Sequence, residues 1–164
     1  MLLEGSCHCE AVRFRVHSSH PYPFNLCYCL ICRKTAGGGG YPINRGGEYA
    51  TLKVDGRAHG RVYQARIRDP DSGEIKRSPA QRNFCALGAS ALSVWNPRWP
   101  QLVHPFASAI DTDLPIPPER THLMLSSKAS WVQLCGKPRD KHFPGYPAES
   151  IAAWHERLGL VGTS

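Results

Sequence analysis

Three cysteines, Cys27, Cys29 and Cys32, lie within the six-residue stretch CYCLIC. Thiolate sulfur is a preferred ligand of zinc, and short spacings let one loop present several sulfurs to the same ion. Because zinc in proteins usually takes four ligands, three protein sulfurs leave one position for water, a substrate or another side chain. The stretch therefore predicts a metal site that is either open for chemistry or closed by a distant residue.

Three further cysteines lie outside this trio, namely the pair Cys7 and Cys9 and the isolated Cys85. Groups of two, three and one suggest two metal sites, because the pair and the single cysteine together leave the trio as a site of its own. The spacing is equally compatible with closed zinc sites that only join loops. A redox switch is another interpretation, in which oxidation links cysteines of the trio and ejects the metal.

Composition favours metal ligation over disulfide bonds. The chain has seven cysteines, an odd number, and its N-terminal segment MLLEGSCHCE lacks a basic stretch followed by a long apolar one. We therefore expect no secretory signal and a cytoplasmic protein. No apolar run is long enough to span a bilayer. The formal charge of +7 comes from scattered arginines, so we expect a solvated basic surface and no nucleic-acid partner.

Short extended segments dominate the rest of the chain. In AVRFRV, Val12, Phe14 and Val16 alternate with two arginines, as in a strand with one solvated face. Further strands are predicted at residues 48–54, 61–67, 91–95, 102–110, 121–125 and 130–134. The sequence thus predicts a mainly β fold.

Helical spacing is found near the C-terminus. The positions i, i+3, i+4 and i+7 are held there by Ile151, Trp154, His155 and Leu158. A shorter helical turn is expected after Cys29, because thiolates often lie beside exposed backbone N–H groups. At 164 residues the chain has the length of one ordinary domain, and we expect residues 1–164 to form a single one with a short C-terminal helix.

Three stretches form an ordered set of motifs: GSCHCEAVRFRV, CYCLICRKTAGG and RNFCALGASAL. Together they resemble the glutathione-dependent formaldehyde-activating enzyme family, also called GFA or the CENP-V/GFA domain. The later segments HPFASAIDTDLPIPPERTHLMLSSKASWVQL and FPGYPAESIAAWHERLG also look like that family, so the resemblance covers nearly the whole chain. It implies an Mss4-like fold, which is a β-rich, zinc-binding architecture.

The resemblance also assigns the cysteines. In the family, the first C-x-C pair joins a late C-x-x-C pair around a structural zinc, and the C-x-C-x-x-C trio is the catalytic zinc site. The matching residues are Cys7, Cys9 and Cys85 for the structural site and Cys27, Cys29 and Cys32 for the catalytic one. The implied cofactor is zinc, with one or two ions per chain.

The activity implied by the resemblance is that of a carbon–sulfur lyase, similar to S-(hydroxymethyl)glutathione synthase. Such an enzyme condenses glutathione, or another thiol, with formaldehyde or a related carbonyl compound at the open three-cysteine site. Zinc there can lower the pKa of the incoming thiol or polarise the carbonyl oxygen. The alternative is a non-catalytic, zinc-stabilised interaction module, for which a buried fourth protein ligand on the trio's metal is expected.

The chain departs from the family pattern in its late motif, where Gly88 stands in place of the fourth cysteine. Water, His8 or a thiol from elsewhere could complete this site, or the site could be weak or empty, with a loss of stability. Cys135 is otherwise unassigned, and we expect it to be a small buried apolar group at a strand end. Glu10 replaces a glycine, so the turn there must accommodate a side chain.

Two basic residues, Arg33 and Lys34, directly follow the trio. They could bind the carboxylates of glutathione, and arginine offers a bidentate fork for this purpose. Their position is equally compatible with solvated loop charges. His104 and His122 are expected to be structural residues and not metal ligands.

Overall fold

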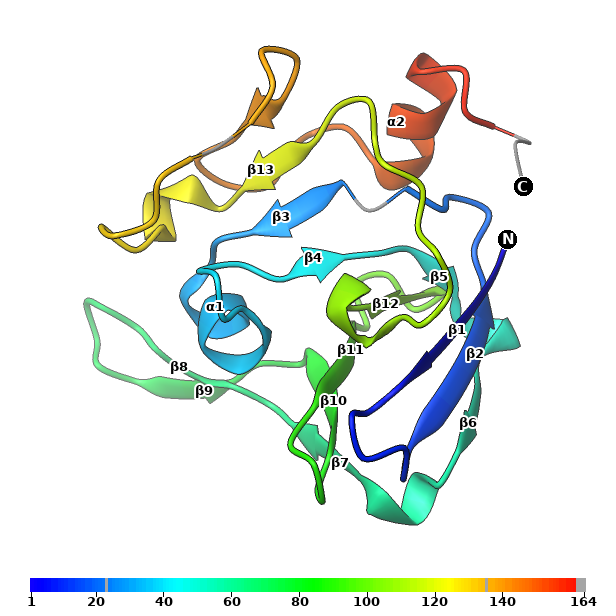
Figure 1. Cartoon of the computed structure of the whole chain (residues 1–164). Coiled ribbons are helices and arrows are strands. Elements are labelled where there is room, and N and C mark those ends of the chain that lie inside the picture. Colours follow the sequence, from blue (N-terminus) through cyan, green and yellow to red (C-terminus); the bar gives the residue numbers. More distant parts are fainter. Residues whose placement is uncertain (23, 135, 162–164) are drawn as a thin grey trace.

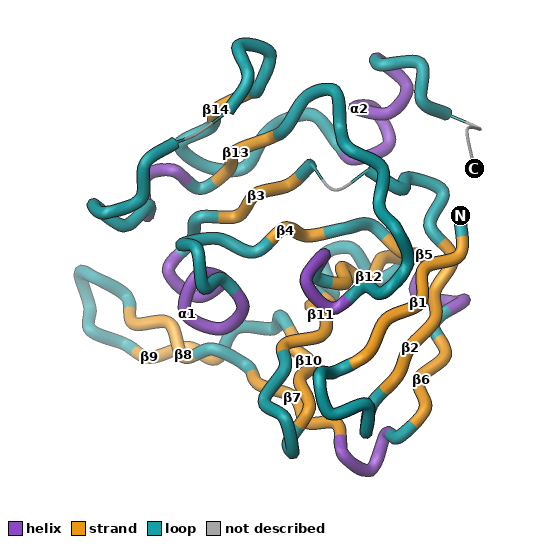
Figure 2. Tube along the Cα trace, in the orientation of Figure 1, coloured by secondary structure: helices purple, strands orange, loops and turns teal. Residues whose placement is uncertain are grey.

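The structure is a computed structural model that describes residues 1–22, 24–134 and 136–161. Within these residues, short strands are connected by long loops, and the α-helices are α1 (Leu30–Ala36) and α2 (Ile151–Arg157) (Figures 1 and 2). Neither described helix has the length and apolar character needed to cross a bilayer. The predicted fold class, mainly β with a short C-terminal helix, is confirmed. The assignment to a single domain stays a prediction.

The described strands form two antiparallel sheets of three and five strands, with the orders β1-β2-β6 and β5-β12-β11-β10-β7. The first sheet contains β1 (Leu2–Ser6), β2 (Arg13–His17) and β6 (Lys53–Asp55). The second contains β5 (Gly47–Glu48), β7 (Gly60–Tyr63), β10 (Gln81–Cys85), β11 (Ala91–Trp95) and β12 (Leu102–Pro105). Figure 1 shows the first sheet, in blue and cyan, beside the green strands of the second.

A third sheet has the order β14-β13-β3-β4, and a separate hairpin is formed by β8 and β9. The strands of this sheet are β3 (Asn25–Cys27), β4 (Ile43–Asn44), β13 (Thr121–Leu123) and β14 (Lys141–His142), and those of the hairpin are β8 (Arg66–Arg68) and β9 (Ile75–Arg77). Strand β13 runs parallel to both β3 and β14, so this sheet joins distant parts of the sequence (Figure 1).

The main hydrophobic core contains buried residues from the three-stranded and the five-stranded sheet, among them Leu3, Phe14, Val16, Leu92 and Val103. Strand β2 shows the predicted alternation, since Phe14 and Val16 are buried between exposed arginines. Removing a side chain of this size from a packed core costs about 2–5 kcal/mol. Strand β1 requires a glycine at position 5, because a Cβ there would collide with the Ala109 carbonyl oxygen and with the Phe14 ring.

Both helical predictions are confirmed. Helix α2 buries Trp154 and His155 completely, and Ser150 caps its N-terminus by accepting a hydrogen bond from the Ala153 N–H at 3.1 Å. The Trp154 ring stacks on Phe24, with centroids 4.4 Å apart and planes 7° from parallel. This contact holds the C-terminal helix against the chain segment that leads into β3.

The strand prediction for residues 91–95 is confirmed by β11, whereas the prediction for 130–134 is wrong. That segment forms no strand because its backbone closes a turn, in which the Val132 N–H donates to the Ala129 carbonyl at 3.1 Å. The Lys128 ammonium donates to the carbonyls of the same two residues, at 2.6 and 3.2 Å. The long predictions at 48–54, 61–67, 102–110 and 121–125 contain shorter strands, each accompanied by a 3-10 turn or a break.

Candidate metal centres

The trio of cysteines lies where β3 passes into α1. Cys27 ends β3 and pairs with Leu123 of β13, which fixes its backbone in a parallel ladder. Cys29 has an extended backbone and caps α1, because its Sγ accepts the N–H of Cys32 at 3.3 Å. This geometry brings the three Sγ atoms within 4.8 Å of one another. The sequence therefore builds the cluster locally, from one strand end and one helical turn.

Burial leaves one side of the trio accessible. Cys27 and Cys32 are 3% and 5% exposed, whereas Cys29 is intermediate. The pKa of the Cys29 thiol is lowered, first by the hydrogen bond from the Cys27 sulfur and then by Cys32, whereas the pKa of Cys27 is raised by the same sulfur contacts. Because these sulfurs contact one another, ionisation of all three together is unfavourable unless positive charge lies nearby.

Arg82 supplies positive charge beside the trio. It lies on β10, its side chain is 8% exposed, and its Nη2 is 3.9 Å from Cys32 Sγ. Its Nε and Nη1 atoms are buried with no hydrogen-bond partner among the described residues. A cation near a sulfur favours the thiolate form. No pattern in the sequence distinguishes Arg82 from the other scattered arginines, although it lies in the RNFC motif.

Other side chains around the trio differ in their burial. Arg33 is half-buried and its Nε has no hydrogen-bond partner within the described part of the chain, whereas Lys34 is exposed. Their predicted contact with glutathione carboxylates stays a prediction. Tyr146 was not singled out from the sequence, yet its pKa is raised by desolvation and by the charge of the three sulfurs. Its ring packs edge-on against Trp99, with centroids 6.1 Å apart.

The second cluster joins the ends of two sheets. Cys7 follows β1 and Cys85 ends β10, and Cys9 Sγ lies 3.4 Å from the Cys7 sulfur and 3.6 Å from the Cys85 sulfur. The Val12 N–H donates to Cys7 Sγ at 3.2 Å, and the Gly88 N–H donates to Cys85 Sγ at 3.4 Å. The latter bond is the main reason that the pKa of Cys85 is lowered. Backbone N–H groups thus stabilise sulfur anions in both turns.

Both turns of this cluster contain a residue with left-handed backbone geometry, Glu10 with φ 60° and Ala89 with φ 53°. The prediction that the first turn accommodates a side chain at Glu10 is therefore met by a left-handed conformation, which costs about 1–2 kcal/mol for a residue with a Cβ. The imidazole of His8 is not among the ligand atoms that gather around the three sulfurs.

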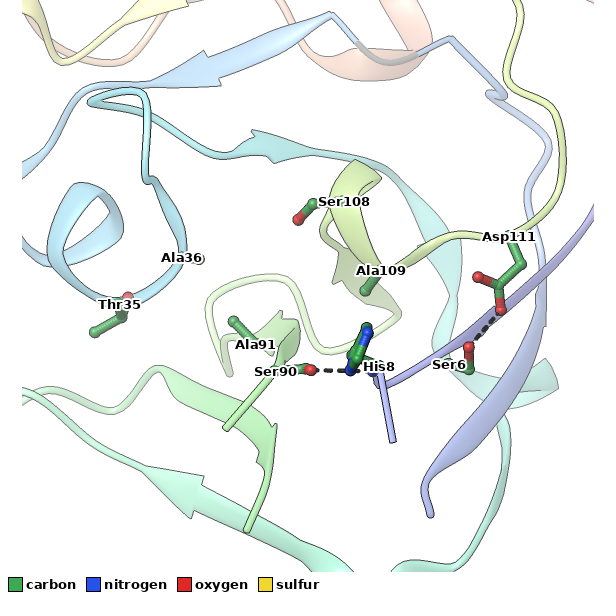
Figure 3. A pocket seen from close by; sticks show the side chains of 9 residues that line it. All are labelled: Ser6, His8, Thr35, Ala36, Ser90, Ala91, Ser108, Ala109 and Asp111. Carbon is green, nitrogen blue, oxygen red and sulfur yellow. Dashed lines mark hydrogen bonds between the residues drawn. The ribbon is translucent and has the colours of Figure 1, made fainter. Parts of the chain in front are cut away.

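Two cavities lie near the clusters. One of about 420 Å³ is lined on one side by Ser6, His8 and Asp111 and on the other by residues of α1 (Figure 3). In Figure 3 the Ser6 hydroxyl donates to the Asp111 carboxylate at 2.7 Å. The second cavity, of about 320 Å³, includes Arg82 in its lining, and both cavities share Thr35 and Ala91. The space next to Arg82 thus adjoins α1, the helix that contains Cys32.

The two histidines predicted to be structural lie outside both clusters. His104 donates through Nδ1 to the Arg45 carbonyl at 2.9 Å. His122 is fully buried, shares a hydrogen bond of 2.9 Å with the Tyr28 hydroxyl, and has its other ring nitrogen 3.6 Å from the Asp140 carboxylate. The prediction for Cys135 concerns a residue outside the described ones.

The donor chemistry of both clusters fits a zinc ion. Each offers three sulfurs within 4.8 Å of one another, and sulfur-rich, compact sites suit zinc better than magnesium or calcium, which prefer oxygen. Among the described residues, no histidine or carboxylate joins either set. Each cluster can therefore hold one metal ion through three thiolates, and each leaves one ligand position unassigned.

Comparisons with known proteins concern the family and the fold. The family model described as glutathione-dependent formaldehyde-activating enzyme matches residues 2–126. A Halomonas elongata protein with the provisional name glutathione-dependent formaldehyde-activating enzyme is 63% identical over 160 residues, which cover 98% of each chain. A crystal structure of a Rhodobacter sphaeroides protein matches with a TM-score of 0.52 at 20% identity, over 68% of this chain and 91% of that one. The last similarity concerns the fold alone.

Proposed function

The chain belongs to the glutathione-dependent formaldehyde-activating enzyme family, and from this premise we propose that it condenses a thiol with a small carbonyl compound at the trio. Glutathione and formaldehyde are the proposed substrates, and zinc held by Cys27, Cys29 and Cys32 is the proposed cofactor. The observation that carries the proposal is the gathering of three sulfurs within 4.8 Å, with no fourth ligand among the described residues. An open position on a metal is what a catalytic zinc site requires.

The reaction is an addition in which every atom of both substrates is retained. The thiol sulfur attacks the carbonyl carbon, a carbon–sulfur bond forms, and the electron pair of the carbonyl π bond moves to oxygen. That oxygen then takes a proton, equivalent to the one that the thiol gives up. Since the reverse direction breaks the carbon–sulfur bond, the enzyme is classed here as a carbon–sulfur lyase of the S-(hydroxymethyl)glutathione synthase type.

A zinc ion bound at the trio would supply Lewis acidity, either to the thiol or to the carbonyl oxygen. The chain's own residues define where the substrates approach. Cys27 and Cys32 are buried, so the accessible direction is on the side of Cys29. Arg82 places a buried positive charge beside the Cys32 sulfur. Negative charge that develops on a nearby sulfur or oxygen is stabilised more strongly there than in water.

The carboxylates of glutathione need positively charged partners outside the metal site. Arg33 directly follows Cys32, is half-buried and has an Nε without a hydrogen-bond partner among the described residues, so it is the better placed of the two basic residues. Lys34 is exposed and offers a mobile point charge. We place the protein in the cytoplasm, where free thiols persist and small thiols such as glutathione are abundant.

The test follows S-hydroxymethylglutathione by exchange NMR, with purified, fully zinc-loaded protein, glutathione and formaldehyde. A rate above that of the spontaneous reaction, abolished by Cys29→Ser, supports the proposal. Cys9→Ser is the matched control, because it removes a sulfur from the other cluster. A rate equal to the spontaneous one at full zinc occupancy contradicts the enzyme and favours the alternative, a non-catalytic zinc-stabilised interaction module.

A further inference from the structure

The cluster of Cys7, Cys9 and Cys85 faces the place where Gly88 has no side chain. We propose that this cluster holds a divalent metal ion through three thiolates and keeps its fourth position for an exchangeable small ligand, either water or a small-molecule thiol. The inference concerns a site other than the one in the proposed function, and it gives the chain a second accessible metal centre in place of a closed structural one.

The three sulfurs are already arranged for a cation. The Cys7 and Cys85 side chains are 1% and 0% exposed, and each sulfur accepts a backbone N–H, from Val12 and Gly88 respectively. The sulfur–sulfur distances of 3.4 and 3.6 Å from Cys9 are those of groups that share a proton or a metal. A set of thiolates so close together is stabilised when a cation compensates their charge.

Position 88 is where a fourth ligand would enter. A Cβ added to Gly88 would lie 3.1 Å from Cys9 Sγ and 3.5 Å from Cys9 Cβ, so a side chain there points into the sulfur cluster. The backbone of Gly88 is not in the left-handed region, and any residue can adopt its conformation. The glycine is therefore not required by the turn, and its effect is to leave the cluster one ligand short.

No described residue takes the vacant place. His8 is the nearest candidate in sequence, but its backbone N–H donates to Ser90 Oγ at 3.1 Å and its ring lies in the larger cavity (Figure 3). The group of ligand atoms around the three sulfurs contains no histidine, aspartate or glutamate from the described part of the chain. Because Cys9 is exposed, the free direction can be reached from solvent.

The strained turns indicate that the ion is retained although the fourth cysteine is missing. Glu10 and Ala89 have φ values of 60° and 53°, which side chains with a Cβ adopt at a cost. Such conformations persist only where the surroundings determine them. Each turn wraps one sulfur with a backbone N–H, and an ion bound by both turns provides that determination. Backbone hydrogen bonds act together with the ion, from the Glu10 N–H to the Cys7 carbonyl at 2.8 Å and from the Cys85 N–H to the Ser90 carbonyl at 2.9 Å.

The experiment uses full-length protein in which cobalt(II) replaces zinc, because the visible spectrum of cobalt reports its ligands. The variants are Gly88→Cys, which adds a fourth thiolate, and Gly88→Ser, which adds a group of similar size that is a weaker ligand. Wild type and Gly88→Ser should bind two ions, and both ions should respond to added 2-mercaptoethanol. In Gly88→Cys only one ion should respond. This variant should also lose its other ion to chelators less readily than wild type does. The gain in metal affinity should exceed roughly 10–100-fold, which is the change that altering an outer-shell partner typically causes.

Three results would overturn the inference. Wild type could hold a single ion while Gly88→Cys holds two, which would mean that three sulfurs do not suffice. His8→Ala or Cys135→Ala could change the spectrum of the second ion, which would identify a protein ligand in the fourth position. Addition of 2-mercaptoethanol could alter in wild type only the ion that also responds in Gly88→Cys, which would mean that the second cluster has no exchangeable position. All of these readouts are independent of turnover, so a failure of the proposed enzyme activity would be recognised separately.

Discussion

The two cysteine clusters use the same ligand type but are assembled differently. The trio comes from one strand end and the first turn of α1, whereas the other cluster joins the end of β1 to the end of β10, across two sheets. A buried arginine lies beside the trio, and only backbone N–H groups support the other sulfurs. Under the proposed function, an ion in the trio would act mainly on chemistry, whereas an ion in the second cluster would also tie two sheets together.

The largest expected effect concerns the trio. Cys29→Ser should reduce formation of S-hydroxymethylglutathione to the spontaneous rate, because the most accessible of the three sulfurs is lost. Its unfolding temperature should change little, since the residue lies in one local turn. Exchange NMR and thermal unfolding on the same sample check both parts. Cys29→Ser with full activity would remove the distinction between the clusters.

The second effect concerns the cluster between the sheets. Cys85→Ser should lower stability, because an ion that binds only the folded state contributes about 4 kcal/mol when its concentration is 1,000-fold above Kd. For a chain of this length that corresponds to a decrease in Tm of about 8–16 °C. Calorimetry with and without a chelator measures it, and the chelator should have a smaller effect on the variant than on wild type. Equal chelator effects on both would contradict the prediction.

Arg82 should link charge to metal retention at the trio. Arg82→Gln should weaken zinc binding there by about 10–100-fold, as loss of an outer-shell partner commonly does. The loss should be greater at pH 6 than at pH 8, because protons compete with the metal for thiolates that the positive charge no longer stabilises. Chelator competition at the two pH values is the measurement. Arg82→Lys is the control and should retain most of the affinity.

The smallest expected effect is the contribution of His104 to the pH dependence of the free energy of unfolding. Burial lowers the pKa of His104, so the unfolded chain binds a proton more readily than the folded one. Its contribution to stability is complete above the unfolded pKa of about 6.5 and is lost as the pH falls, by up to about 1.4 kcal/mol per pH unit. His104→Asn can still donate to the Arg45 carbonyl and should flatten urea unfolding free energies between pH 6.5 and 5. An unchanged slope would contradict a contribution of His104, because other buried histidines such as His122 and His155 also have a lowered pKa.

Local patterns in the sequence were sufficient for several features. The alternation of Phe14 and Val16 placed β2, and the spacing of Trp154 and His155 placed α2, because each depends on the period of one element. The grouping of the cysteines followed from their spacing and the family resemblance. For β2, α2 and the trio, neighbours in sequence are also neighbours in space, whereas the grouping of Cys85 with Cys7 and Cys9 depended on the family resemblance.

Other features depend on contacts that no local pattern encodes. The parallel pairing of Cys27 with Leu123 and the approach of Arg82 to Cys32 both require a register between distant strands. The segment 130–134 has the apolar residues of a strand, but the Val132 N–H closes a turn onto the Ala129 carbonyl and the Val132 carbonyl accepts a hydrogen bond from Lys128. Tyr146 was missed for the same reason, since its proximity to the trio arises only after the C-terminal loops fold back.

The parallel ladder between β3 and β13 has a consequence for biosynthesis. Residue 27 leaves the ribosome early, but its partner at residue 123 is made nearly one hundred residues later. At translation rates of about 5–20 residues per second, the early thiols remain without their final backbone partner for roughly 5–20 seconds. Metal delivered during that interval meets a flexible, unfinished loop. Loading of the mature geometry must follow synthesis of most of the polypeptide.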